Sequence, residues 1–267
     1  MSSHAPEANR VDRLSVCIVA HNEAANIARA LESVTGWAGE VIVLDCESSD
    51  ATGDIARGMG AQVHRRPNRL PELSKNDGFE LAGREWILSL DADEVVTPGL
   101  KREIETTIER NPPENGFKLP RRNFYFDVPL MHGGNYPDKQ LRLFRRGRGR
   151  FPSGALHERM RIDGEVGELH SPLDHFPYPS FDVWLRKFDF YTSLEAARLE
   201  ERDVTIDPRA IRRYMIVRPM KRWLERLFLK RGLRDGAAGV LAATFDLVSQ
   251  VVSFGKYWER KSRQRRG

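Results

Sequence analysis

Cysteines and long apolar runs are scarce in this chain of 267 residues. Its two cysteines, Cys17 and Cys46, are too few for a disulfide framework, and both lie in or beside apolar runs that predict buried side chains. The N-terminal segment lacks the apolar core of a signal peptide. The weakly polar stretch from Gly236 to Val252 contains Asp246 and is shorter than the roughly 20 residues that a membrane-spanning helix needs. We therefore expect a cytoplasmic protein that is soluble or peripherally attached to a membrane, not an integral one.

Glycine-rich phosphate loops are absent as well. The chain has no GxGxxG after its first apolar run and no GxxxxGKS or GxxxxGKT anywhere, which argues against the dinucleotide-binding and P-loop folds. It also lacks a nucleic-acid recognition module and an interleaved aromatic platform. We therefore expect no nucleic-acid partner, although the chain is basic.

The positive charge is concentrated towards the C-terminus. Residues 208–267 contain 16 Lys or Arg and 4 Asp or Glu, so the other 207 residues carry a balance of −7 within the net charge of +5. A charge confined to one segment predicts a polyanionic surface as its partner.

Strands and helices alternate over the first 110 residues. Apolar runs at 14–20, 40–44, 61–64 and 86–90 predict strands, and the segments 24–34, 52–59, 73–82 and 98–109 predict helices. This order predicts an α/β fold whose mostly parallel sheet has helices on both faces. Helical patterns return at Phe181 and continue almost to the end of the chain.

Polar clusters follow three of the predicted strands, where ligands bind in parallel sheets. They are His21–Glu23, Asp45–Asp50 and Asp91–Asp93. Two carboxylates two residues apart suit Mn²⁺ or Mg²⁺, and such a cation offsets the charge of a nucleotide diphosphate. The alternative is that Asp91 and Asp93 only end a strand and cap a turn.

Four segments, SVCIVAHNEAANI, VIVLDCESSDAT, SKNDG and WILSLDADE, resemble in order and spacing the donor-binding half of family 2 glycosyltransferases, which have the GT-A fold. The resemblance covers Leu14–Glu109 and implies a nucleotide-sugar donor. It places Asp91 at the ribose or the metal and Asp93 at the metal. The other donor-binding residues that it implies are Glu23, Asp45 and Asp50 at the nucleoside, and Lys75 and Asn76 near the base and diphosphate. His21 departs from the family's usual Tyr or Phe, and a structural role is its alternative.

Three later segments, KQLRLFRR, ALHERM and GLRDGAAG, resemble the lipopolysaccharide-core β-glucosyltransferase branch of that family. This resemblance implies inverting transfer of a hexose from UDP to a lipid-linked or lipopolysaccharide-core saccharide at the cytoplasmic membrane face. Polyprenyl phosphate or protein acceptors, a nucleotidyltransferase and a non-catalytic membrane scaffold are the alternatives. The implied organisation is a flexible N-terminus (1–12), a GT-A catalytic domain (13–180, with a donor half 13–110 and an acceptor half 111–180) and a basic helical extension (181–267).

An inverting transfer needs a carboxylate that removes the proton of the acceptor hydroxyl. Glu158 is the first candidate, because it follows His157 in the resemblance, and Asp138 is the second. Gln140 and Arg142 are expected at the diphosphate, since Arg donates in a bidentate fork. The alternatives are an exposed Glu158 paired with a nearby Arg and a solvated basic strand.

The segment Pro219–Arg231 is amphipathic. Its apolar stripe consists of Met220, Trp223, Leu224 and Leu227, and its polar face consists of Lys221, Arg222, Glu225 and Arg226. Basic residues opposite a Trp/Leu stripe predict an interfacial helix on an anionic membrane surface. Packing of the same stripe on the catalytic domain is the alternative.

Overall fold

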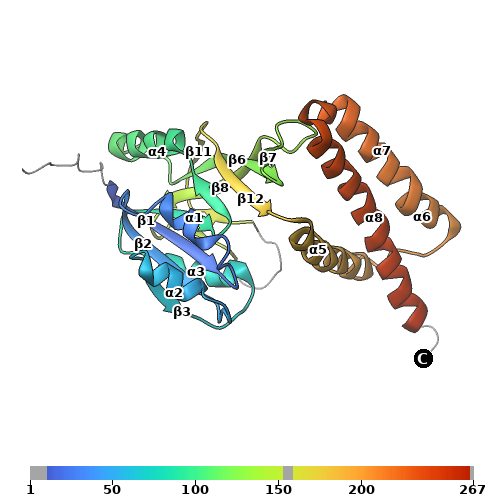
Figure 1. The fold of residues 1–267 in the computed structure, drawn as a ribbon, viewed down its shortest axis with the longest axis horizontal. Helices are drawn as coiled ribbons and strands as arrows, with labels where there is room; N and C mark the ends of the chain where they lie inside the picture. The colour runs from blue at the N-terminus through green and yellow to red at the C-terminus, as the bar shows by residue number, and fades with distance from the viewer. Residues whose placement is uncertain (1–10, 153–158, 265–267) are drawn as a thin grey trace, which may run out of the picture. The chain divides into compact units, whose positions relative to one another are not determined.

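The computed structural model describes residues 11–152 and 159–264, and it forms two compact units (Figure 1). The sheet unit consists of Met1–Arg121 and Asp138–His175, and the helical unit consists of Arg122–Pro137 and Phe176–Gly267. The predicted organisation placed one boundary between the catalytic domain and the extension, at residue 180. The two compact units instead divide the chain discontinuously, because residues 122–137 group with the C-terminal helices.

A mixed sheet runs in the order β3-β2-β1-β4-β8-β6-β12-β5. Its parallel part consists of β1 (Val11–Ala20), β2 (Ala38–Asp45), β3 (Gln62–Arg65) and β4 (Trp86–Asp91). The remaining strands are β5 (Glu94–Val96), β6 (Gly116–Tyr125), β8 (Asp138–Arg145) and β12 (Leu173–Tyr178), with short β7 (Val128–Pro129) and β11 (Val166–Glu168) beside β6. A separate antiparallel pair is formed by β9 (Gly149–Arg150) and β10 (Arg161–Ile162). β8 runs antiparallel to both β4 and β6, whereas the short β11 pairs parallel with β6, so the sheet is mixed beyond its parallel N-terminal part.

Four helices cover both faces of this sheet. They are α1 (Ile27–Glu32), α2 (Thr52–Gly58), α3 (Pro71–Leu81) and α4 (Pro98–Arg110). Val16 and Ile18 of β1 pack in one apolar cluster with side chains of α1, α2 and α4, whereas Cys17 packs in a second cluster with Phe79 of α3. Successive strand residues point to opposite faces, so the two-sided arrangement predicted from the sequence is confirmed.

Both cysteines are buried thiols, as predicted. Burial raises the pKa of Cys17 to about 12, and the charge of Glu40 adds to the effect. Cys17 donates to the carbonyl oxygen of Gly78 on α3 at 3.3 Å, so its role is to pack a helix against the sheet.

The first helix of the helical unit is α5 (Phe181–Glu201), whose first turn is capped by Ser180. A continuous helical stretch from 208 to 229 follows, and α and π segments alternate in it. These are α6 (Pro208–Arg212), the π-helix η1 (Arg213–Val217), α7 (Arg218–Leu224) and the π-helix η2 (Glu225–Leu229). A 3-10 turn η3 (Gly232–Asp235) leads into the final helix α8 (Gly236–Gln264). The predicted C-terminal helical extension is therefore confirmed.

Helix α8 continues beyond Val252, where the apolar stretch of the sequence ends. Within the described residues, Gly232–Gln264 is the one helical stretch long and apolar enough to cross a membrane by length and composition. The prediction that the apolar segment beginning at Gly236 is too short to span a membrane is therefore wrong, because the helix that contains it extends to Gln264. Phe254 and Tyr257 of α8 are buried against Ala196 and Leu199 of α5, whereas other large apolar side chains of the same helix are exposed, namely Val240, Leu241, Val248 and Trp258.

Candidate active site

The carboxyl ends of three parallel strands bring the predicted polar clusters to one edge of the sheet. Ala20 of β1 is in register with Asp45 of β2, and Val19 is in register with Asp91 of β4. The segments that leave these strands therefore start side by side, although they lie far apart in the sequence.

Asp45 and Asp50 shape the loops beyond β1 and β2. Asp45 is buried, and its Oδ1 accepts a hydrogen bond from the Ser48 amide at 2.9 Å. Asp50 accepts from the amides of Ala24 at 3.1 Å and Thr52 at 3.0 Å, which ties the loop after β1 to the start of α2. Burial opposes ionisation of Asp50, but the hydrogen bonds from Thr52 and Ala24 outweigh it and lower its pKa.

Glu23 and His21 belong to the same loop. The Oε2 atom of Glu23 accepts from the side-chain amide of Asn26 at 2.7 Å. The Nδ1 atom of His21 lies 2.6 Å from the carbonyl oxygen of Cys46, and because a carbonyl only accepts, this nitrogen is the donor. His21 thus joins the ends of β1 and β2, which supports its structural role.

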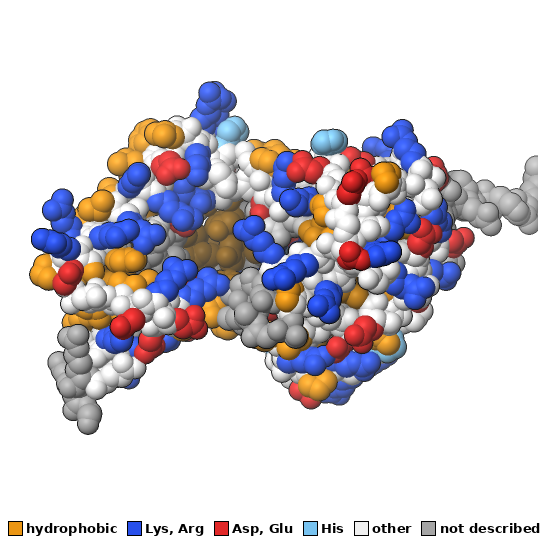
Figure 2. Space-filling view, turned by 180° about the vertical axis from the view of Figure 1, so that it is seen from behind, with side chains coloured by type: hydrophobic (Ala, Val, Ile, Leu, Met, Phe, Trp, Pro, Cys, Tyr) orange, Lys and Arg blue, Asp and Glu red, His pale blue; other side chains and the backbone are white. Residues whose placement is uncertain are grey.

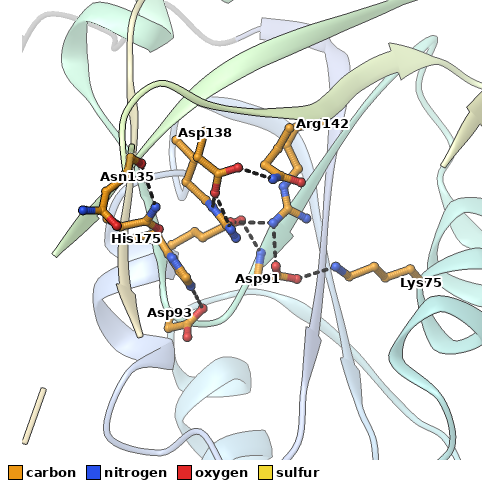
Figure 3. A network of polar contacts seen from close by, with 11 residues as sticks. Lys75, Asp91, Asp93, Asn135, Asp138, Arg142 and His175 are labelled. Atoms are coloured by element: carbon orange, nitrogen blue, oxygen red, sulfur yellow. Dashed lines mark hydrogen bonds and ion pairs between the residues drawn. The ribbon is translucent and has the colours of Figure 1, made fainter. Parts of the chain in front are cut away.

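Asp91 lies between two cations, as Figure 3 shows. Its Oδ1 is 2.6 Å from Nζ of Lys75, and its Oδ2 is 2.5 Å from a guanidinium nitrogen of Arg142. Burial alone would raise the pKa of Asp91, but the charges of Arg142 and Lys75 hold it well below the usual value. The sequence predicted all three residues, and the structure brings them together.

Glu94 connects this cluster to Asp138, and it was not among the residues predicted from the sequence. Its side chain is fully buried, and its Oε1 contacts Arg142 at 2.5 Å and Arg121 at 3.4 Å. Arg121 also donates from Nε and a terminal nitrogen to Oδ2 of Asp138, at 3.0 and 2.7 Å. Burial opposes the charge of both arginines, but the carboxylates around them raise both pKa values. An acidic residue in an apolar strand directly after Asp93 was the available signal for Glu94.

Asp93 faces a second residue that the sequence did not reveal. Its Oδ1 lies 3.5 Å from Nε2 of His175, and Figure 3 shows the two side chains pointing towards one another. His175 is brought there because β12 pairs antiparallel with β5, which places it opposite Glu94. No local motif marks this histidine, since the pairing joins segments about 80 residues apart.

A carboxylate and an imidazole suit Mn²⁺-like cations. Asp93 and His175 fit such an ion as a partial ligand set, whereas both oxygens of Asp91 contact cationic side chains. Among residues 11–152 and 159–264, no group of three His, Cys, Asp or Glu side chains is arranged to hold a metal. The described residues therefore offer two ligands here, and phosphate oxygens would help to complete the shell.

Asn76 and Gln140 form hydrogen bonds with other parts of the sheet unit. The amide of Asn76 donates to the Phe151 carbonyl at 2.8 Å and accepts from its N–H at 2.9 Å, while Lys75 lies 5.8 Å from the centre of the Phe151 ring. Gln140 donates to Oδ1 of Asp138 at 2.7 Å. Glu158 lies outside the described residues, so its proposed role stays a prediction.

Comparison with known proteins confirms the predicted family. Residues 15–146 match the model of the family described as Glycosyl transferase family 2. An uncharacterized glycosyltransferase of Rickettsia prowazekii is 41% identical over 205 residues, which are 70% of this chain and 68% of that protein. One of Rickettsia felis is 28% identical over 205 residues, with 71% of each chain covered.

A solved structure shares the fold at low sequence identity. The mannosyltransferase PcManGT from Pyrobaculum calidifontis, in complex with GDP-Man and Mn²⁺, superposes with a TM-score of 0.52 at 13% identity. The match covers 92% of this chain and 87% of that one. It therefore includes the helical extension as well as the sheet.

Proposed function

Because this chain belongs to glycosyltransferase family 2, we propose that it transfers a hexose from a UDP-sugar, with inversion, to a lipid-linked or lipopolysaccharide-core saccharide. The observation that carries the proposal is the cluster at the end of β4, where Lys75 and Arg142 flank Asp91 and where Asp93 faces His175. A cationic pair beside a partial metal site suits a diphosphate leaving group. The Pyrobaculum protein of the same fold binds GDP-Man and Mn²⁺, which supports a nucleotide-sugar donor and a divalent cation but does not select the base.

Lys75 and Arg142 bind the diphosphate and stabilise the charge that develops on it as the sugar leaves. Arg142 is almost fully buried and held by Glu94, so its guanidinium is oriented before the donor arrives. Its Nε is buried without a hydrogen-bond partner, so the guanidinium retains an unused donor. A divalent cation, Mn²⁺ or Mg²⁺, held by Asp93 and His175 would supply Lewis-acid stabilisation of the same oxygens.

The proton of the acceptor hydroxyl goes to a carboxylate. Glu158 is the proposed base, and Asp138 is the alternative. Asp138 accepts from the Arg121 fork and from Gln140, and these contacts orient its carboxylate. A general base must have its carboxylate within hydrogen-bond reach of the acceptor hydroxyl.

The acceptor side of the proposal rests on the resemblance to the core β-glucosyltransferase branch and on the basic helical extension. The enzyme would work as a peripheral protein at the cytoplasmic face of a membrane, where a lipid-linked saccharide is presented. Polyprenyl phosphate and protein are the competing acceptors.

A ligand screen tests the donor and the cation directly. Thermal unfolding of the full chain would be measured with UDP, GDP and their sugars, with Mn²⁺, Mg²⁺ or chelator. We expect UDP and a UDP-hexose to raise the unfolding temperature in a metal-dependent manner. Stabilisation by GDP and GDP-sugars but not by UDP or UDP-sugars would show that the donor carries guanine and not uracil. No stabilisation by any nucleotide, together with no sugar-nucleotide hydrolysis, would favour the non-catalytic scaffold.

A further inference from the structure

Exposed apolar side chains are concentrated in the helical unit. Among the described residues, 20 large hydrophobic side chains are exposed, and all except Val166 belong to that unit. Scattered apolar residues on a surface are ordinary, but a concentrated set marks an interaction surface. In Figure 2, hydrophobic side chains lie interspersed with Lys and Arg over the helical unit, in the left part of the view.

The helical stretch from 208 to 229 carries two adjacent apolar rows, each with a spacing of four residues. The inner row consists of Pro219, Trp223 and Leu227, of which Leu227 is 3% exposed and Trp223 donates to Thr244 of α8 at 3.2 Å. The outer row consists of Ile216, Met220, Leu224 and Phe228, which are 58%, 42%, 44% and 57% exposed. The predicted single stripe is therefore divided, and its Trp223 and Leu227 already pack inside the unit.

The alternation of α and π segments keeps the outer row straight. A row spaced by four drifts in one direction around an α-helix of about 3.6 residues per turn. It drifts in the opposite direction around the wider π turn, whose hydrogen bonds span five residues. Because Ile216 and Phe228 lie in π segments and Met220 and Leu224 lie in α7, the drifts oppose one another. The outer row therefore presents one apolar edge.

Positive charge surrounds that edge. Residues 208–234 contain ten Lys or Arg and a single acidic residue, Glu225. Arg212, Lys221 and Arg231 are exposed, and none of them makes an ion pair within the described part of the chain. Two copies of this chain that met through this face would bring like charges together, which disfavours a homodimer. An anionic lipid surface complements both the charge and the apolar edge.

We propose that Ile216, Met220, Leu224 and Phe228, continued by Leu229 and Leu233, insert into an anionic membrane surface while the neighbouring Lys and Arg contact lipid phosphates. Leu229 is the most exposed of these side chains, at 79%. The long Lys and Arg side chains can reach the headgroups beside an inserted apolar row. This inference identifies the membrane-binding face of the proposed peripheral enzyme, but it rests on the helical unit and not on the chemistry of transfer.

Site-specific labelling tests insertion. Cys17 and Cys46 are buried, so an environment-sensitive fluorophore would select the new thiol of Leu229→Cys. We expect a blue shift and an intensity increase with phosphatidylglycerol-rich vesicles. The matched control is Val166→Cys, at the 41% exposed apolar residue of the sheet unit, which should not respond. No response at position 229, or an equal response at both positions, would overturn the proposal.

Vesicle flotation of the unlabelled full chain separates lipid from a second copy as the occupant. Leu224→Asp/Phe228→Asp should lower binding to phosphatidylglycerol-rich vesicles by about tenfold or more, whereas Val166→Asp should leave it unchanged. High salt and pure phosphatidylcholine vesicles should each weaken wild-type binding. If the double variant folds poorly, Leu229→Asp replaces it. A wild-type dimer that the variant converts to monomer, with vesicle binding retained, would show that the face joins two copies. Donor-induced thermal shifts report on the proposed function independently of both results.

Discussion

Asp91 and its two cations, Lys75 and Arg142, form a partly buried charge cluster in the sheet unit. Its folded pKa is depressed by Arg142 and Lys75 against the effect of burial. A depressed carboxylate stabilises the fold fully above its unfolded pKa, and that contribution disappears as the pH falls through the folded pKa. We expect the stability gap between wild type and Asp91→Asn to be large at neutral pH and to shrink on acidification below about pH 4. Urea unfolding at several pH values measures the gap, and a constant gap would contradict the assignment.

Substitution of Asp93 or His175 should change the metal dependence of UDP binding. Asp93→Ala should abolish transfer and remove the Mn²⁺-dependent part of the UDP thermal shift, while the unfolding temperature without ligand changes little. His175→Ala should weaken the metal dependence without abolishing it, because Asp93 remains as a ligand. The control is His170→Ala, in the segment between β11 and β12. Full activity of Asp93→Ala in the presence of chelator would reject the metal role.

The catalytic base is decided by two isosteric variants. Glu158→Gln should retain the dissociation constant of the donor and lose at least about 10²-fold in turnover, within the range usual for a general base. Asp138→Asn should affect turnover less, by disturbing Arg121 and Gln140. The informative data are turnover and donor affinity for both proteins. Normal turnover of Glu158→Gln with a dead Asp138→Asn would assign the base to Asp138.

At the scale of single elements, two glycines of α8 should respond to the same substitution in opposite ways. A Cβ on Gly239 would lie 2.0 Å from the carbonyl oxygen of Gly232, whereas one on Gly255 would meet no atom within 4 Å. Ala is favoured over Gly inside a helix by about 1 kcal/mol. We therefore expect Gly255→Ala to stabilise the protein by up to that amount and Gly239→Ala to destabilise it, as measured by chemical unfolding. Equal effects would mean that the start of α8 does not pack closely on η3.

The strands that carry the donor site are the elements that the sequence predicts best. β1, β2 and β4 are short apolar runs buried on both faces, so their carboxyl ends locate Asp45, Asp91 and their neighbours without further information. Arg121 and His175 escape such a prediction, because their positions depend on antiparallel pairings between distant segments. The sequence also could not predict that the apolar stripe of Pro219–Arg231 is divided into a packed and an exposed row. Helical periodicity does not show which of two adjacent apolar rows a neighbouring helix covers.

At the scale of the whole molecule, the helical extension supports a segment that lies far from it in the sequence. Leu130 is fully buried among Ala238 and Ala242 of α8 and leads, through residues 131–137, to Asp138. Removal of residues 208–267 uncovers Leu130. We expect the shortened chain to lose transfer and vesicle binding, whereas UDP affinity changes only a few-fold, because Lys75 and Arg142 belong to the sheet unit. Calorimetric titration with UDP and a transfer assay would be carried out on the full and the shortened chain. Normal transfer by the shortened chain would show that transfer does not depend on residues 208–267.

The discontinuous division of the chain has a consequence for recombination. The polypeptide passes between the two units at Arg121–Arg122, Pro137–Asp138 and His175–Phe176, and a residue of the charged network stands at each passage. A chimera that exchanges only the C-terminal part between relatives keeps residues 122–137 of the old parent, and Leu130 then meets a foreign α8. A chimera that preserves the packing of the helical unit must exchange residues 122–137 and 176–267 together. Its junctions would lie beside Arg121, Asp138 and His175.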